Sequence, residues 1–278
     1  MSDTESAGAL YDNRWGSFRR ADVKAIEIHQ FPCLADNYGF LVHDAEALVT
    51  AAIDTPDASA ILAALEERGW TLTHVLNTHH HADHAGGNLE LKRRTRCRIV
   101  GPRADAARIP GIDVEVGDGD AFELGLHRVE VFDTPGHTRG HIAYFLPEDG
   151  AAFVGDTLFS LGCGRLFEGT PAQMWSSLQK IMSWPERTRI YCAHEYTQAN
   201  GRFALTVEPG NRALAERVAD VARLRSKGEP TVPTTLALEK ATNPFPRPTS
   251  RDLQRTIGML GESEVEVFAK TRALKDAF

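Results

Sequence analysis

The chain has 278 residues, carries a formal net charge of −7 and is 42% hydrophobic, which is enough apolar material for one large domain or two ordinary ones. An excess of acidic residues offers no general attraction to nucleic-acid phosphates or anionic lipids, so we expect neither nucleic acid nor a membrane as a partner. The four cysteines are scattered without a close pair. That distribution argues against a disulfide framework and favours the cytoplasm.

Residues 1–22 mix acidic, small and basic side chains and lack the apolar core of a signal peptide. We interpret them as a mobile N-terminal tail. No apolar run elsewhere approaches the length of a membrane span.

Residues 23–195 are expected to form one α/β domain rich in strands. Runs of strand length and apolar character occur at 25–28, 39–42, 51–53, 75–76, 98–100, 129–132, 142–145, 152–154 and 190–192. One helix is predicted to begin at Asp57 and to end at Gly69. Another begins after Thr170, which can cap the helix and is followed by Pro171 at its first position.

Residues 196–278 are predicted to form a small, all-helical domain, because the strand pattern stops after His194. Residues 211–227 carry apolar side chains on one helical face, and residues 264–278 form a terminal helix. The segment between them is rich in Pro, Thr and Asn and is expected to be a loop.

The segment 78–84 reads Thr-His-His-His-Ala-Asp-His and directly follows a strand-like run. Crowded imidazoles and a carboxylate would leave unmatched polar groups in a protein interior unless cations organised them. We therefore interpret the segment as part of a metal site.

Three further side chains also follow predicted strands: His137, Asp156 and His194. In layered α/β folds the carboxyl ends of strands meet at one edge, where distant residues converge. Together with the first segment they make seven candidate ligands: His79, His81, Asp83, His84, His137, Asp156 and His194. A catalytic zinc site uses about three protein ligands, so seven favour two ions that share one carboxylate, and the expected chemistry is hydrolysis.

These motifs resemble the metallo-β-lactamase superfamily. The blocks at 162–169, 194–197, 207–211, 228–233 and 243–247 narrow the resemblance to the glyoxalase II (hydroxyacylglutathione hydrolase) family. It implies an αββα sandwich followed by a small C-terminal helical domain. It also implies that His79, His81 and His137 bind one ion, that Asp83, His84 and His194 bind the other, and that Asp156 bridges them. Asp83 and Asp156 are the carboxylates expected to take part in catalysis.

The same resemblance implies a binding site for the glutathione moiety, formed by Arg165, Phe167, Tyr196, Arg247 and Arg251. Some family members have Lys and Tyr where this chain has Arg165 and Phe167, so a cation is kept and a phenol hydroxyl is lost. His80, between two ligands, is expected to point away from the ions. His141 is expected to support the site without binding metal.

The implied activity is hydrolysis of the thioester of an S-2-hydroxyacylglutathione, chiefly S-D-lactoylglutathione to D-lactate and glutathione, in methylglyoxal detoxification. The expected partner is this small molecule, and the chain is expected to be a monomer. A persulfide dioxygenase with one iron held by two histidines and an aspartate is the alternative, and a non-enzymatic metal-bound scaffold is a third possibility. Zinc is the expected metal, while histidine and carboxylate ligands also accept iron or manganese.

Overall fold

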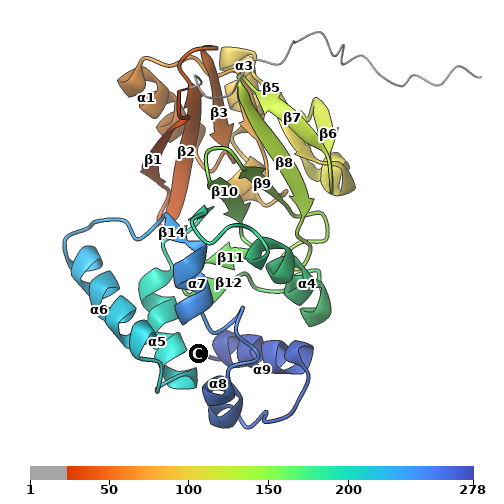
Figure 1. The fold of residues 1–278 in the computed structure, drawn as a ribbon. Helices are drawn as coiled ribbons and strands as arrows, with labels where there is room; N and C mark the ends of the chain where they lie inside the picture. Colours follow the sequence, from red (N-terminus) through yellow and green to blue (C-terminus); the bar gives the residue numbers. More distant parts are fainter. Residues whose placement is uncertain (1–23) are drawn as a thin grey trace, which may run out of the picture.

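The computed structural model describes residues 24–278 and contains two stacked β-sheets with helices on both outer faces (Figure 1). The predicted N-terminal tail, residues 1–22, lies outside the described residues. The expected αββα sandwich is confirmed.

The first sheet has six strands in the order β1-β2-β3-β4-β5-β6. The pairs β1–β2 and β2–β3 are antiparallel, and the remaining pairs are parallel. The strands are β1 (Glu27–Cys33), β2 (Asn37–Asp44), β3 (Val49–Ile53), β4 (His74–Leu76), β5 (Arg98–Pro102) and β6 (Val114–Val116).

The second sheet also has six strands, in the order β14-β13-β10-β9-β8-β7. Its pairs are antiparallel except for β10–β13, which is parallel. The strands are β7 (Ala121–Leu124), β8 (His127–Asp133), β9 (Ile142–Leu146), β10 (Ala151–Gly155), β13 (Arg189–Cys192) and β14 (Thr234–Thr235). A short hairpin, β11 (Leu158–Phe159) with β12 (Gly162–Cys163), follows β10.

The main core fills the space between the sheets, where Phe40 of β2 contacts the rings of Phe153 and Tyr191 from the opposite sheet. A second core lies between the outer face of the first sheet and helices α1 (Ala58–Arg68) and α3 (Asn88–Thr95). The outer face of the second sheet is covered by α4 (Pro171–Met182). Trp184, just beyond that helix, stacks on Phe145 of β9. Each sheet thus has one face in the central core and one face covered by helices.

Helix ends follow the capping residues of the sequence. Asp57 accepts hydrogen bonds from the first turn of α1, and Gly69 ends that helix in the left-handed region at φ 66°. Thr170 and Gln173 form the capping box that begins α4. These predicted boundaries are confirmed.

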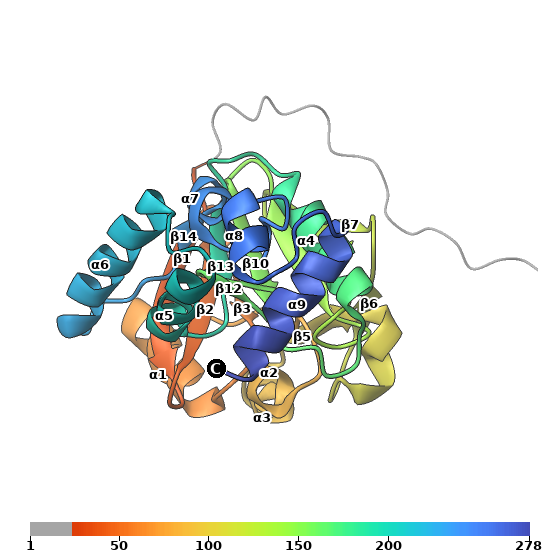
Figure 2. The same ribbon diagram turned by 90° about the horizontal axis from the view of Figure 1, so that it is seen from below.

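The C-terminal segment forms one end of the molecule, below the sandwich in Figure 1 and facing the viewer in Figure 2. Its helices are α5 (Thr197–Val207), α6 (Arg212–Ser226), α7 (Leu236–Thr242), α8 (Arg251–Thr256) and α9 (Glu264–Asp276). The prediction that this segment is all-helical is wrong at β14, which pairs with β13 and extends the second sheet. A two-residue strand carries too short a pattern to be seen in the sequence.

The elements not yet named are α2 (Ala82–Ala85) and a 3₁₀ helix, η2 (Arg103–Arg108). Within residues 24–278, no helix has the length and apolar character that crossing a membrane requires.

Candidate metal centre and substrate cavity

The seven predicted ligands converge at one end of the sandwich. The segment that contains His79 and His84 follows β4 of the first sheet, whereas His137, Asp156 and His194 follow β8, β10 and β13 of the second. The strand ends of both sheets therefore bring together side chains that lie more than a hundred residues apart.

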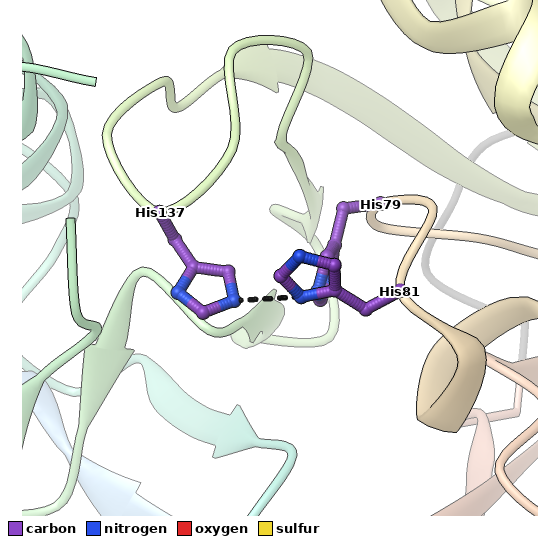
Figure 3. Close-up of side chains that lie close together, drawn as sticks. All are labelled: His79, His81 and His137. Carbon is purple, nitrogen blue, oxygen red and sulfur yellow. Dashed lines mark hydrogen bonds between the residues drawn. The ribbon is translucent and has the colours of Figure 1, made fainter. Parts of the chain in front are cut away.

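His79, His81 and His137 form a first group (Figure 3). Nε2 of His79 and Nε2 of His137 each lie 3.1 Å from Nδ1 of His81. Ligands around a tetrahedral ion with bonds of roughly 2.0–2.1 Å are about 3.3 Å apart, so these nitrogens have the spacing of ligands to one ion.

Asp83, His84 and His194 form a second group. Oδ2 of Asp83 lies 3.5 Å from Nε2 of His84 and 3.5 Å from Nε2 of His194. Two imidazole nitrogens and a carboxylate oxygen are again a donor set suited to a divalent ion.

Asp156 lies between the two groups and faces each with a different oxygen. Its Oδ2 is 3.3 Å from Nε2 of His137, and its Oδ1 is 3.5 Å from Nε2 of His84 and 3.4 Å from Nε2 of His194. This is the arrangement that a bridging carboxylate requires.

Two buried polar atoms without partners also indicate that the donor set fits metal ions. Among residues 24–278, Nε2 of His84 and Oδ1 of Asp156 are buried polar atoms without a hydrogen-bond partner. A buried polar atom left unpaired is destabilising, and a coordinated cation satisfies both atoms at once.

In three of the five candidate histidines, the other ring nitrogen is held by an acceptor outside the ligand set. Nδ1 of His84 donates to Asp54 at 2.8 Å, Nδ1 of His194 donates to Asp36 at 2.9 Å, and Nδ1 of His137 donates to the carbonyl of Arg165 at 2.9 Å. Such bonds fix the tautomer and ring orientation, which leaves Nε2 free to bind metal. Asp36 and Asp54 carry no signal in the sequence, because each is far in sequence from the ligand that it orients.

Two other histidines are placed as predicted. His80 turns to Asp105, with Nδ1 3.2 Å from its carboxylate. Nε2 of His141 accepts a hydrogen bond of 3.0 Å from the backbone nitrogen of Asp156, so His141 holds the peptide of Asp156.

The protonation states of His79 and Asp156 suit metal binding, whereas at His84 burial is outweighed by Asp156 and Asp54, which raise the pKa to about 9, so that an ion bound there would displace a proton. Burial and the neighbouring histidines lower the pKa of His79 well below its usual value. Burial opposes ionisation of Asp156, but His84, His194 and His137 outweigh it and hold the pKa of the carboxyl below its usual range. Neutral imidazole and ionised carboxylate are the forms that coordinate metal.

A cavity of about 630 Å³ opens over these ligands. Five of the seven candidate ligands line it, and beyond them its lining includes Phe159, Cys163, Arg165, Phe167, Tyr196, Asn200, Arg202, Arg272, Lys275, Asp276 and Phe278. The metal groups and the C-terminal helices therefore share one cavity.

Three of the predicted substrate-binding residues line this cavity. The ring of Tyr196 stacks on His194 with centroids 4.7 Å apart. Phe167 lies edge-on to His81 and His137, at 5.7 and 5.1 Å, and is largely exposed. Arg165 is exposed beside them.

Arg247 and Arg251 are placed differently from the prediction, because neither is among the residues that line the cavity. The guanidinium of Arg247 makes two hydrogen bonds to the buried carboxylate of Glu208, at 3.1 and 3.2 Å, and a third to the carbonyl of Lys240. Its donors are thus used inside the helical segment. Arg251 is the first residue of α8.

The cavity instead receives cations that the sequence analysis missed: Arg202 from α5, and Arg272 and Lys275 from α9. Arg272 and Lys275 are three residues apart and so share one face of their helix. Two basic residues at this spacing can be seen in the sequence, but they occur equally on a helix face that only contacts solvent.

Comparison with known proteins agrees with this geometry. Residues 40–194 match the metallo-beta-lactamase superfamily, and residues 195–278 match the hydroxyacylglutathione hydrolase C-terminus. A hydroxyacylglutathione hydrolase from Maricaulis maris (strain MCS10) is 57% identical over 251 residues, which cover 90% of this chain and 98% of that protein. This chain belongs to the hydroxyacylglutathione hydrolase family.

Another member of the hydroxyacylglutathione hydrolase family, from Methylococcus capsulatus (strain ATCC 33009 / NCIMB 11132 / Bath), is 55% identical and covers 91% of this chain and 99% of its own length. Among solved structures, ETHE1 from Myxococcus xanthus superposes with a TM-score of 0.62 at 27% identity and covers 90% of this chain and 99% of its own. The chain is a metallo-β-lactamase-fold hydrolase, and its histidine and aspartate cluster is a site for divalent metal.

Proposed function

We propose that this enzyme hydrolyses the thioester of S-2-hydroxyacylglutathiones, chiefly S-D-lactoylglutathione to D-lactate and glutathione, in methylglyoxal detoxification. The observation that carries the proposal is the position of Asp156. Its two oxygens face two separate donor groups at the floor of a cavity lined with cations.

We propose His79, His81 and His137 as ligands of one ion, Asp83, His84 and His194 as ligands of the other, and Asp156 as the bridge. When bound there, two such ions would supply a hydroxide at neutral pH and would polarise a carbonyl. Asp156 would balance positive charge on both sides of the site, and Asp83 would supply the second carboxylate. A thiol with a pKa of about 8.5 leaves as a thiolate without a general acid, so the absence of one from these motifs is consistent with thioester cleavage.

The glutathione moiety of the substrate, which we call the substrate handle, carries charges that match the part of the cavity lined by the C-terminal helices. Glutathione carries two carboxylates and one ammonium group. Arg165, Arg202, Arg272 and Lys275 line the cavity together with Asp276. Neighbouring cations add to burial in lowering the pKa of Lys275, so a bound carboxylate would relieve their mutual repulsion. Tyr196 and Phe167 supply apolar surface between this cationic region and the metal ligands.

The test is thioester hydrolysis of S-D-lactoylglutathione by protein whose metal content is measured by elemental analysis. We expect two ions per chain and turnover that rises with the content of metal. A preparation with one ion per chain and full activity would refute the two-metal mechanism.

Asp156→Ala is the ligand change expected to be most damaging, because a bridging carboxylate serves both donor groups. Metal content and turnover should fall together. Near wild-type values of both would show that the bridging assignment is wrong.

A persulfide dioxygenase is the alternative function. It would use one iron with two histidines and an aspartate, and it would consume oxygen with glutathione persulfide. The two donor groups that meet at Asp156 favour the hydrolase, and oxygen uptake with that substrate distinguishes the two.

Zinc is the metal that we propose, since imidazole and carboxylate donors at tetrahedral spacing suit it. We also propose that the protein is a monomer. We propose the cytoplasm as its location, which the four buried free cysteines support. A division into a catalytic part at 23–195 and a glutathione-binding part at 196–278 is supported by the two family matches, which meet at residues 194 and 195.

A further inference from the structure

Arg108, at the end of η2, lies outside the predicted site and contacts three segments that build it. Its guanidinium donates to both oxygens of Glu168, with Nη2 to Oε2 at 3.0 Å. It also donates to Nε2 of His80 at 3.0 Å and to the carboxylate of Asp105. His80 in turn donates from Nδ1 to Asp105, which closes a ring of hydrogen bonds. We call these four residues the Arg108 clasp.

Glu168 belongs to the segment 164–169, which carries Arg165 and Phe167 into the cavity. The same carboxylate accepts a hydrogen bond of 2.9 Å from the backbone nitrogen of Arg139, in the loop that contains His137. Hydrogen bonds from Arg108 lower the pKa of Glu168 to about 2, so this carboxylate is ionised throughout the neutral range. Its charge is fully available to hold both loops.

The clasp reaches all three loops around the first donor group. His80 lies between the ligands His79 and His81, while Glu168 is adjacent to Phe167, whose ring contacts His81 and His137. Backbone hydrogen bonds from Phe167 to His137 and from Gly169 to Gly136 hold the base of the segment without the clasp. The clasp therefore acts on the part of the segment whose side chains face the substrate.

We propose that Arg108 and Glu168 are positioning residues that hold the segment 164–169, and with it Arg165 and Phe167, in the place where the substrate handle binds. The kinetic part of this inference rests on the proposed function. A bidentate pair fixes both distance and orientation, which a single contact from an exposed side chain does not.

The test uses the metal-loaded full chain with Arg108→Ala, Glu168→Ala and the double variant. We expect the KM for S-D-lactoylglutathione to rise about ten-fold in each, with kcat within about three-fold and metal content unchanged. A small thioester without the glutathione moiety should be hydrolysed as in the wild type. The double variant should lose less than the sum of the two single losses, because both changes remove the same pair.

Arg103→Ala is the matched control, since Arg103 lies on the same 3₁₀ helix and pairs with Asp120 away from the cavity. It should leave both substrates unaffected. Arg108→Lys keeps the charge without the planar fork and should give an intermediate KM. This variant keeps the test decisive if Arg108→Ala does not fold.

Hydrogen exchange gives a readout independent of activity. Amides of 164–169 should exchange about ten-fold faster in Arg108→Ala than in the wild type or Arg103→Ala. Unchanged exchange, additive losses in the double variant, or equal losses on both thioesters would overturn the inference. If the wild type does not hydrolyse S-D-lactoylglutathione, the proposed function fails, while the exchange experiment still decides the positioning role.

Discussion

Nδ1 of His84 lies 2.8 Å from Oδ2 of Asp54, and the same carboxylate accepts hydrogen bonds from the backbone nitrogen and the hydroxyl of Thr78. Asp54 thus holds one proposed metal ligand and, at the same time, the start of the segment that contains His79, His81 and Asp83. Asp36 has a simpler role toward His194 and is more exposed, at 45% of its side chain against 7% for Asp54.

Asp54→Asn should weaken metal binding about 10- to 100-fold, because an amide cannot accept the hydrogen bond from Nδ1 of His84 with the strength of a carboxylate. Asp36→Asn should have a smaller effect, since water can replace an exposed partner. Competition with a chromophoric chelator measures both. Equal affinities in the two variants would contradict this ranking.

Lys275→Ala should raise the KM for S-D-lactoylglutathione about ten- to a hundred-fold, because the loss of a charge-assisted hydrogen bond is worth roughly 1.5–3 kcal/mol. The handle is bound alike in the ground and transition states, so kcat should change little. Lys270→Ala, an exposed change on the same helix outside the cavity lining, is the control. A fall in kcat at constant KM would argue against a binding role for Lys275.

Arg247→Ala should reduce stability and not substrate affinity. It leaves the carboxylate of Glu208, which is 1% exposed, without its charged partner. We expect a loss of about 1–3 kcal/mol in the free energy of unfolding, measured by urea denaturation. The KM of the folded variant should stay near the wild-type value. A higher KM with unchanged stability would restore Arg247 to the glutathione site.

His127 should make stability depend on pH. Its hydrogen bond to Asp149, at 2.8 Å, outweighs burial and raises its pKa, and Asp44 and Glu123 add to the effect. A raised pKa in the folded state means that the stabilisation is complete below the unfolded value of about 6.5 and is lost as the pH rises through the folded value. The difference in melting temperature between wild type and His127→Gln should be largest below pH 6.5 and shrink at higher pH. A constant difference from pH 5.5 to 9 would contradict this.

Much of the site could be predicted from the sequence because its signals are local. The segment 78–84 concentrates ligands within seven positions, and His137, Asp156 and His194 each follow a run of strand-forming residues. A strand end can be recognised from its own residues, and the carboxyl ends of strands in a layered α/β fold meet at a common edge. The order of strands within the two sheets was not accessible, because pairing depends on residues far apart in sequence.

The sequence by itself determined the donor side chains, the strand-rich α/β character of the first part of the chain and the ends of helices such as α1 and α4, since each depends on residue types at short spacing. The αββα arrangement of the layers was implied by the family resemblance. Only the tertiary structure decided which cations face the substrate. Arg247 and Lys275 are both basic residues of the helical segment, yet one neutralises the buried Glu208 and the other lines the cavity. The difference comes from how α5, α8 and α9 pack, because a charge in a helical sequence looks the same whether its partner is solvent, a buried carboxylate or a substrate.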